Sequence, residues 1–176
     1  MNKIRVMNEL LSNKIAAGEV VEKVVSIVKE LVENSVDAKA TNIKIDLKEA
    51  GIREIIVTDN GIGMNREDAP LAFQRHATSK LYTDDDLWNI SSLGFRGEAL
   101  PSIAAVSDVI LKTCDGEVGT MVHIKGGKIE KVTNSEARIG TQITVTSMFY
   151  NTPARLKHLS CLLYTSPSPR DLSTSR

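Results

Sequence analysis

The sequence predicts an α+β fold, in which helices cover one face of a mostly antiparallel sheet. Three observations support this class: one long segment has the apolar period of a helix, several short segments alternate as strands do, and the connections between strands are short. Short connections favour antiparallel pairing. The chain has 176 residues, of which 41% are hydrophobic and 25% charged, and this is enough for one domain with a buried core.

The first predicted element is a helix over residues 20–36, where apolar residues recur every three or four positions and include Val25 and Val36. Residues 42–49 then alternate apolar and polar side chains, and a turn at Gly51 leads into a second strand that ends at Asp59. We therefore expect a β-hairpin after the helix. Residues 64–100 have no regular pattern and are expected to be mobile.

The second half of the chain is predicted to be mostly strand. A short helix over residues 100–106 precedes strands within residues 107–113, 119–132 and 140–148. Gly126 and Gly127 predict a tight hairpin turn inside the second of these segments. After Leu163, serine, threonine and proline are dense and no packed element is expected.

Composition narrows the class of protein only a little. Lys plus Arg and Asp plus Glu both total 22, so no net positive field indicates nucleic-acid binding. Cys114 and Cys161 form neither a disulfide framework nor a metal-ligand pattern. The N-terminal residues have no secretory signal and no membrane span, so we expect a cytoplasmic protein.

Glu30, Asn34 and Asp37 are polar residues within the predicted helix. At about 100° per residue they fall within roughly 60° of one another, opposite the stripe of valine and leucine. A solvated face is the simplest interpretation. A mid-helix asparagine weakens it, because asparagine is a poor helix former. The alternative is a ligand: the Asn34 amide coordinates a phosphate-bound Mg²⁺ and Glu30 polarises a water.

The segment "DNGIGM", residues 59–64, is a second candidate site. An aspartate at the end of a strand, followed by Gly61 and Gly63, makes a tight loop that a ligand can approach closely. The Asp59 carboxylate is an acceptor only, and it could take the exocyclic amine of adenine. A simple turn explains the same residues, because Asp-Asn-Gly is common in turns.

Residues 93–103 and 75–80 are candidate phosphate-binding segments. Gly94 and Gly97 precede a predicted helix, whose N-terminal N–H groups can hold phosphate, although the spacing is not that of a Walker A loop. A flexible connector is the alternative. The hydroxyls and cations that the two segments offer are Thr78, Ser79, Arg75, Lys80 and Arg96.

Taken together and in this order, six stretches resemble the ATPase region of the MutL family of DNA mismatch repair proteins. They are "NKIAAGEVVE", "KELVENSVDA", "DNGIGM", "RHATSKL", "GFRGEALPSIAAV" and "FYNTPARLKHL", and the resemblance covers residues 4–159. This family lies within the gyrase, heat-shock chaperone, histidine kinase and MutL superfamily. The resemblance implies a two-layer α/β sandwich, with helices on one face of a mixed sheet and a flexible lid over ATP.

The resemblance also implies a role for each matching residue. Glu30 matches the general base that activates water, and Asn34 matches the Mg²⁺ ligand. Asp59 matches the residue that recognises adenine, and Thr141 matches the hydroxyl beside the base. Residues 75–98 match the lid. The residues that complete the implied nucleotide site are Gly61 and Gly63 in the loop beneath the base, and Thr78, Ser79, Gly94, Phe95, Arg96 and Gly97 along the phosphates.

The function implied by the resemblance is slow, Mg²⁺-dependent ATP hydrolysis by in-line attack of water. ATP binding would order the lid and an N-terminal arm, residues 1–18, so that two ATP-binding domains, each residues 19–160, form a homodimer. The implied partners are a mismatch-recognition protein, an endonuclease or sliding clamp, and DNA, with no membrane. In this way ATP would couple mismatch recognition to downstream strand incision.

Two substitutions at the helix ends depart from the family. "KVVS" at residues 23–26 replaces a usual Arg-Pro-Ala-Ser run, so we expect the helix to begin earlier. Lys39 stands where glycine is usual, so we expect strain if that position needs a left-handed conformation.

The C-terminal part departs further. In the family the sheet is completed and a second domain carries a lysine that reaches the γ-phosphate. Here residues 161–176 are expected to be a non-native or disordered tail on a truncated domain. A nucleotide-binding or interaction module without turnover is therefore an alternative. A gyrase-type or chaperone ATPase is a second alternative, and a histidine kinase is disfavoured because neither His76 nor His123 lies in a phospho-acceptor helix.

Overall fold

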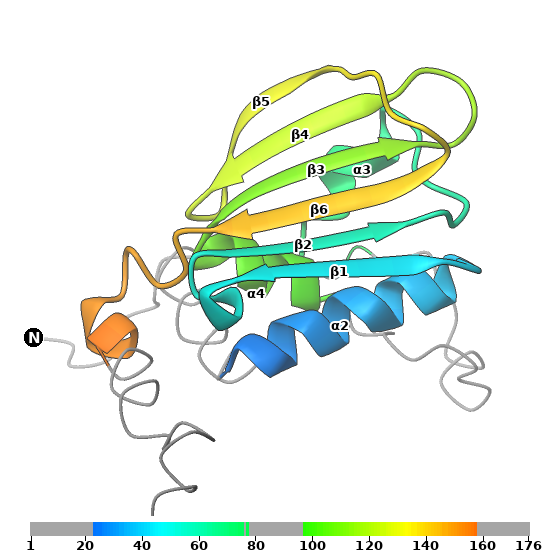
Figure 1. The fold of residues 1–176 in the computed structure, drawn as a ribbon. Coiled ribbons are helices and arrows are strands. Elements are labelled where there is room, and N and C mark those ends of the chain that lie inside the picture. Colours follow the sequence, from blue (N-terminus) through cyan, green and yellow to red (C-terminus); the bar gives the residue numbers. More distant parts are fainter. Residues whose placement is uncertain (1–22, 76, 78–96, 158–176) are drawn as a thin grey trace, which may run out of the picture.

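The computed structural model describes residues 23–75, 77 and 97–157 (Figure 1). The elements in chain order are α2 (Val24–Asp37), β1 (Ile43–Lys48), the 3₁₀ turn η1 (Glu49–Gly51), β2 (Glu54–Asp59), α3 (Asp68–Leu71), α4 (Ala99–Ala105), β3 (Asp108–Cys114), β4 (Thr120–Lys125), β5 (Lys128–Asn134) and β6 (Gly140–Thr146). The predicted arm at 1–18, most of the predicted lid and the tail at 161–176 lie outside the described residues.

The six strands form one sheet in the order β1-β2-β6-β3-β4-β5. All five pairings in the described sheet are antiparallel. Figure 1 shows α2, α3 and α4 on the same side of this sheet. The predicted α+β class, with helices on one face, is therefore confirmed. The last strand in sequence, β6, lies between β2 and β3, so the two hairpin regions of the chain share one sheet.

Both predicted hairpins are present. β1 and β2 pair from Ile43 opposite Asp59 to Lys48 opposite Glu54, with η1 in the turn. β4 and β5 are joined by Gly126 and Gly127, which have φ of 57° and 81°. Two consecutive residues with positive φ are the geometry of a type I′ turn, whose twist matches that of the flanking strands.

The core consists of two apolar rows that cross the sheet on its helical face. In the first row, each residue lies opposite the next in the order Ile55, Val145, Val109 and Ile124. In the second row the order is Val57, Ile143, Leu111 and Val122. Each of these side chains is at most 6% exposed. They pack in one cluster with Ile27 and Leu31 of α2 and Ile103 of α4. Burial of each such side chain contributes about 1.5 to 3 kcal/mol to folding.

Helix α2 begins at Val24, with Lys23 as its N-cap in an extended conformation. In the family, the position of Val24 is held by the proline that marks the first residue of the helix. The helix begins at this same position here, so the expectation that it begins earlier is wrong. Lys23 makes no side-chain capping bond. The start is therefore fixed by packing, because Val24 is partly buried against the core.

The polar face of α2 does not lie where the sequence pattern predicted it. The residues of α2 that are buried are Ile27, Leu31 and Ser35. Glu30 and Asn34 are partly buried beside them, whereas Val25 and Val36 are 65% and 45% exposed. The prediction that the polar face opposes the valine and leucine stripe is wrong, because the buried side of α2 is narrow and the outer valines face away from it.

The C-terminus of α2 has the hydrogen bonds of a Schellman motif. The Lys39 N–H donates to the Val36 carbonyl at 2.9 Å, and the Ala40 N–H donates to the Ser35 carbonyl at 3.1 Å. Lys39 has a φ of 62°, which is the left-handed conformation expected for the position where the family has glycine. A side chain with a Cβ costs about 1 kcal/mol in that conformation.

We expect Lys39→Gly to raise the free energy of unfolding by about 1 kcal/mol, because glycine adopts a left-handed conformation without a Cβ penalty. Urea unfolding followed by circular dichroism measures the change. The matched control is Lys39→Ala, which removes the same charge but keeps the Cβ and should stay within about 0.5 kcal/mol of the original chain. An equal gain in both variants would assign the effect to the lysine side chain instead.

Candidate functional site

A polar row crosses the sheet directly beyond the two apolar rows, on the same helical face. It consists of Asp59 on β2, Thr141 on β6, Thr113 on β3 and Thr120 on β4, each opposite the next. Asp59 is partly buried and the threonines are at most 9% exposed. Polar groups at this depth need hydrogen-bond partners. The row lies at one end of the sheet, where β2 and β3 end and β4 and β6 begin.

The Asp59 carboxylate joins three segments of the chain. Its Oδ2 accepts a hydrogen bond from the Ser35 hydroxyl of α2 at 2.8 Å. Its Oδ1 accepts the N–H of Gly61 at 2.9 Å and the N–H of Thr141 at 3.2 Å. A carboxylate has about four acceptor positions, and these bonds occupy three of them. Among the described residues no further donor takes the fourth position, on Oδ2, and a ligand could supply one.

The loop that follows Asp59 is packed on the end of α2. The Ile62 N–H donates to the Ala38 carbonyl at 2.9 Å. A Cβ on Gly61 would lie 2.7 Å from the same carbonyl oxygen, so only glycine fits there. Asn60 holds the segment between α2 and β1, because its Oδ1 accepts the N–H groups of Thr41 and Asn42 at 2.9 and 2.8 Å.

The far end of the loop is packed on β3. Gly63 has a φ of 68°, and a Cβ there would lie 1.9 Å from the Cys114 carbonyl oxygen. The Met64 N–H donates to the Thr113 hydroxyl oxygen at 2.9 Å. The loop is therefore held at both ends, by α2 on one side and by β3 on the other.

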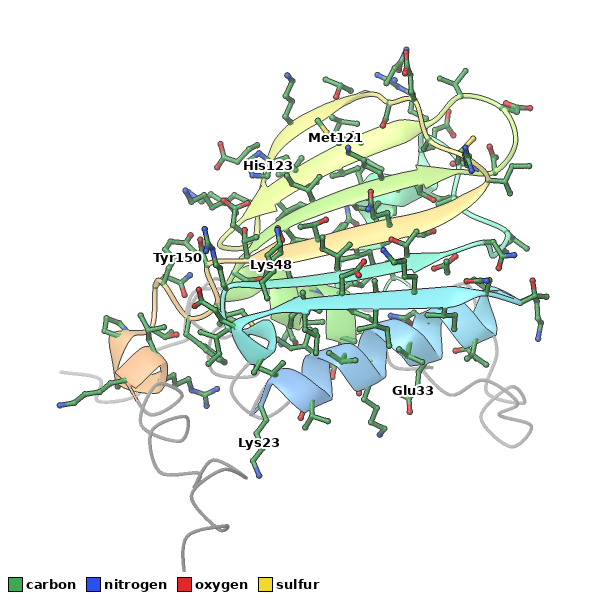
Figure 2. The ribbon with its side chains drawn as sticks, viewed as in Figure 1. Lys23, Glu33, Lys48, Met121, His123 and Tyr150 are labelled. Atoms are coloured by element: carbon green, nitrogen blue, oxygen red, sulfur yellow. The ribbon has the colours of Figure 1, made fainter. Side chains whose placement is uncertain are left out.

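Glu30 and Asn34 lie one turn apart on the flank of α2 and are partly buried. Glu33 is partly buried as well; its carboxylate is 3.4 Å from the Lys29 ammonium, and Figure 2 shows its side chain pointing away from the sheet. A partly buried carboxylate and amide at this spacing can present two oxygens to one ligand.

The structure places the predicted site residues in three groups. Asp59, Gly61, Gly63 and Thr141 share the polar end of the sheet, as the hydrogen bonds above establish. Glu30 and Asn34 lie on α2, which the Ser35 hydroxyl joins to Asp59. Gly97 lies against Ala77, because a Cβ on it would be 2.6 Å from the Ala77 carbonyl oxygen. The predicted residues that lie outside the described part of the chain are Thr78, Ser79, Gly94, Phe95 and Arg96.

Sequence reasoning missed two residues of this network. Ser35 lies within the predicted helix and was not named as a candidate, yet its hydroxyl is within bonding distance of both the Leu31 carbonyl and Asp59. Thr113 was taken as an ordinary strand residue, yet it is fully buried and contacts Thr141. A hydroxyl at a buried position of an apolar pattern was the available signal in both cases.

The described residues contain no group of three or more histidine, cysteine, aspartate or glutamate side chains that could hold a metal ion. None of the described helices has both the length and the apolar character needed to cross a membrane.

Residues 22–153 match the family described as Histidine kinase-, DNA gyrase B-, and HSP90-like ATPase. This match covers most of the chain, and the chain belongs to that family. Within it, the described fold and the sequence are those of the N-terminal ATPase region of MutL DNA mismatch repair proteins.

Curated relatives and solved structures agree on this region. The chain is 56% identical over 163 residues to MutL of Geobacillus sp. (strain WCH70), which covers 92% of this chain and 26% of the relative. It is 55% identical over 163 residues to MutL of Shouchella clausii (strain KSM-K16), covering 93% and 25%. The chain thus spans about a quarter of the length of the curated relatives it matches.

Among solved structures, the chain is similar to the Aquifex aeolicus MutL ATPase domain complexed with ADP. The TM-score is 0.56 at 31% identity, and the match covers 78% of this chain and 48% of that one. A crystal structure of the N-terminal domain of a DNA repair protein gives a TM-score of 0.72 at 31% identity, covering 86% of this chain and 44% of that one.

We expect Ser35→Ala to lower the free energy of unfolding by about 1 to 2 kcal/mol, because it removes a hydrogen bond to a carboxylate. The matched control is Ser102→Ala in α4, since Ser102 is 1% exposed and its hydroxyl has no hydrogen-bond partner among the described residues. This control should be neutral or slightly stabilising. Urea unfolding of both variants checks the difference. Equal losses would show that burial of the hydroxyl matters rather than its bond to Asp59.

Proposed function

We propose that this chain forms the ATP-binding part of a MutL-type DNA mismatch repair protein. The observation that carries the proposal is the Asp59 carboxylate, which is held by Ser35, Gly61 and Thr141 and keeps one acceptor position on Oδ2. A rigid acceptor at the edge of a buried apolar core suits a flat base with an exocyclic amine. Membership in the ATPase family supports ATP as the nucleotide.

The loop after β2 would hold Asp59 in place beneath the base. Gly61 and Gly63 carry no side chains, and the backbone of the loop is fixed against Ala38 and Cys114. A fixed backbone keeps the acceptor in place before the ligand arrives, so little ordering entropy is lost on binding. The Thr141 hydroxyl lies on the strand next to Asp59 and would be the second polar group beside the base.

The phosphates would extend from the base toward Glu30 and Asn34. The Asn34 amide oxygen suits a Mg²⁺ ion that the phosphates carry, because a neutral ligand adds no further negative charge. The bound ion would offset charge on the transferred phosphoryl group. Glu30 would orient and polarise the attacking water as a general base, and attack would be in line on the γ-phosphoryl group without a covalent intermediate.

Slow hydrolysis fits a switch better than a metabolic enzyme. Binding of ATP would favour a state in which the arm and the lid are ordered and two copies dimerise, and hydrolysis would release that state. In the whole protein this switch would couple a mismatch-recognition protein to an endonuclease or sliding clamp on DNA. The relatives' own printed description as DNA mismatch repair proteins supports this assignment.

The alternative is a module that binds nucleotide without turning it over. In such a module, the lysine that the resemblance assigns to the γ-phosphate would have to come from a second domain. Both proposals place the nucleotide against Asp59. They differ only in whether Glu30 acts on a water in this chain.

We expect Asp59→Asn to weaken binding of Mg²⁺-ATP at least about tenfold, because the amide places a donor where the adenine amine needs an acceptor. Isothermal titration of the full chain with ATP measures it. The control is Asp46→Asn on β1, the same change on the opposite face of the sheet. Unchanged affinity in Asp59→Asn, in a folded sample that binds ATP, would place the base elsewhere.

We expect Glu30→Gln to keep the ATP affinity within about threefold and to lower the turnover rate by about a hundredfold, because glutamine cannot accept a proton. Phosphate release under single-turnover conditions gives the rate. Glu33→Gln is the matched control on the same helix, since Glu33 is paired with Lys29. Loss of binding together with turnover in Glu30→Gln would contradict the assignment of Glu30 as the base. Absence of turnover in the unmodified chain would favour the binding module.

A further inference from the structure

The C-terminal end of α4 is hydrogen-bonded to two segments that are distant from it in the sequence. The last carbonyls of a helix have no partner within the helix. Here they accept donors from the β4–β5 turn and from the segment after β6. The bonds are Gly127 N–H to the Ala104 carbonyl at 2.8 Å, Asn151 Nδ2–H to the Ala105 carbonyl at 2.8 Å, Phe149 N–H to the Val106 carbonyl at 2.7 Å, and Gly126 N–H to the Ser107 carbonyl at 3.0 Å. Together they fix the end of α4 relative to the sheet.

The segment after β6, residues 147–152, adopts an unfavourable backbone conformation to reach α4. Ser147 and Phe149 have φ of 52° and 60°, the left-handed region in which a Cβ approaches the following carbonyl. Strain of this kind persists only where the surrounding structure holds it in place. The Phe149 side chain is 1% exposed, and its N–H is bonded to Val106. The segment is therefore held against α4 by packing as well as by hydrogen bonds.

Asn151 supplies the one side-chain donor among these four bonds to α4. The other three donors are backbone N–H groups, so a substitution at Asn151 can remove one bond and leave three. The Oδ1 atom of Asn151 is buried and has no hydrogen-bond partner among the described residues. The bond to the Ala105 carbonyl is thus the described hydrogen bond of this side chain, and Ala105 is itself only 2% exposed.

Helix α4 connects this end of the sheet to the part of the proposed site that would take the phosphates. Its Ile103 packs in one cluster with Ile27 and Leu31 of α2, the helix that carries Glu30 and Asn34. Gly97, two residues before α4, is one of the residues that the resemblance places along the phosphates. The base end of the site is held differently, because the hydrogen bonds described above for the Asp59 carboxylate come from α2, the following loop and β6.

We propose that Asn151 is a positioning residue for the phosphate end of the ATP site. By bonding the Ala105 carbonyl to the segment after β6, it fixes α4, and α4 in turn fixes Gly97 and the flank of α2. Asn151 acts from a distance, since it lies beyond the end of β6, at the end of the sheet opposite the polar row. This inference rests on the proposed function. It predicts that binding of the phosphates, and not of the base, depends on the Asn151 amide.

The experiment compares the dissociation constants of Mg²⁺-ATP and of adenosine, which has no phosphate, by NMR titration of the full chain. Asn151→Ala removes the donor to Ala105. We expect the affinity for ATP relative to adenosine to fall about fivefold, which is the size of one weakened hydrogen bond to phosphate. Because the preference is a ratio within one sample, a general loss of folded protein cancels from it. A purely structural role would weaken both ligands equally.

The matched control is Ser107→Ala, which removes a side-chain hydrogen bond from the same end of α4. The Ser107 side chain is 0% exposed, and its hydroxyl donates to the Ile103 carbonyl at 2.6 Å. This donor belongs to the chain that directly follows α4, so the bonds from the distant segments remain. We expect the ratio to stay within about twofold of the original. A fall as large as that in Asn151→Ala would assign the effect to a general loosening of the helix end and overturn the inference.

A second measurement uses the unmodified chain, in case Asn151→Ala does not fold. If bonds to the end of α4 favour phosphate binding, then phosphate binding must strengthen those bonds, because coupling between two sites is reciprocal. We expect amide hydrogen exchange of Phe149 and Gly127 to be slowed at least about threefold more by saturating Mg²⁺-ATP than by saturating adenosine.

The outcomes separate this inference from the proposed function. Equal protection of Phe149 and Gly127 by ATP and adenosine, or parallel weakening of both ligands in Asn151→Ala, would overturn the inference while leaving the proposed function intact. Failure of the folded, unmodified chain to bind ATP would overturn the proposed function itself, and this inference with it.

Discussion

The Asp59 carboxylate is the group on which the rest of this arrangement depends. It ends β2, and its three hydrogen bonds join α2 through Ser35, the following loop through Gly61 and strand β6 through Thr141. Each of these segments comes from a different part of the sequence. One acceptor therefore fixes the relative positions of a helix, a loop and two strands, and no other donor in the described part of the chain takes its remaining position.

The polar row is tolerated in the core because nearly every member has a partner. Unpaired burial of a hydroxyl or amide costs about 1 to 3 kcal/mol, and the row avoids most of this cost through bonds between Asp59, Thr141 and Thr113. Thr120 is the exception. The apolar rows and the polar row thus divide the sheet into a part that stabilises the fold and a part that carries the proposed site.

Much of this arrangement was predictable from the sequence, and the rest depends on pairings that are far apart in the chain. The period of α2 and the alternation of β1 predicted the elements, because these patterns repeat within a few residues. The same period wrongly predicted that Val25 and Val36 are buried, because a period does not determine how wide the buried side of a helix is. Ser35 was missed because its role depends on how α2 packs on the sheet, and Thr113 was missed because its role depends on strand register.

At the C-terminal end of α2, the free-energy cost of one backbone conformation is linked to the geometry of the site. Lys39 adopts a left-handed conformation that glycine would adopt more easily. That conformation reverses the chain after Ala38, so that the backbone of residues 41 and 42 reaches the Asn60 side chain. It also leaves the Ala38 carbonyl free to accept the Ile62 N–H. A cost of about 1 kcal/mol at one residue is thus offset by three hydrogen bonds that hold the loop after Asp59. The site is therefore ordered by the end of the helix as well as by the sheet.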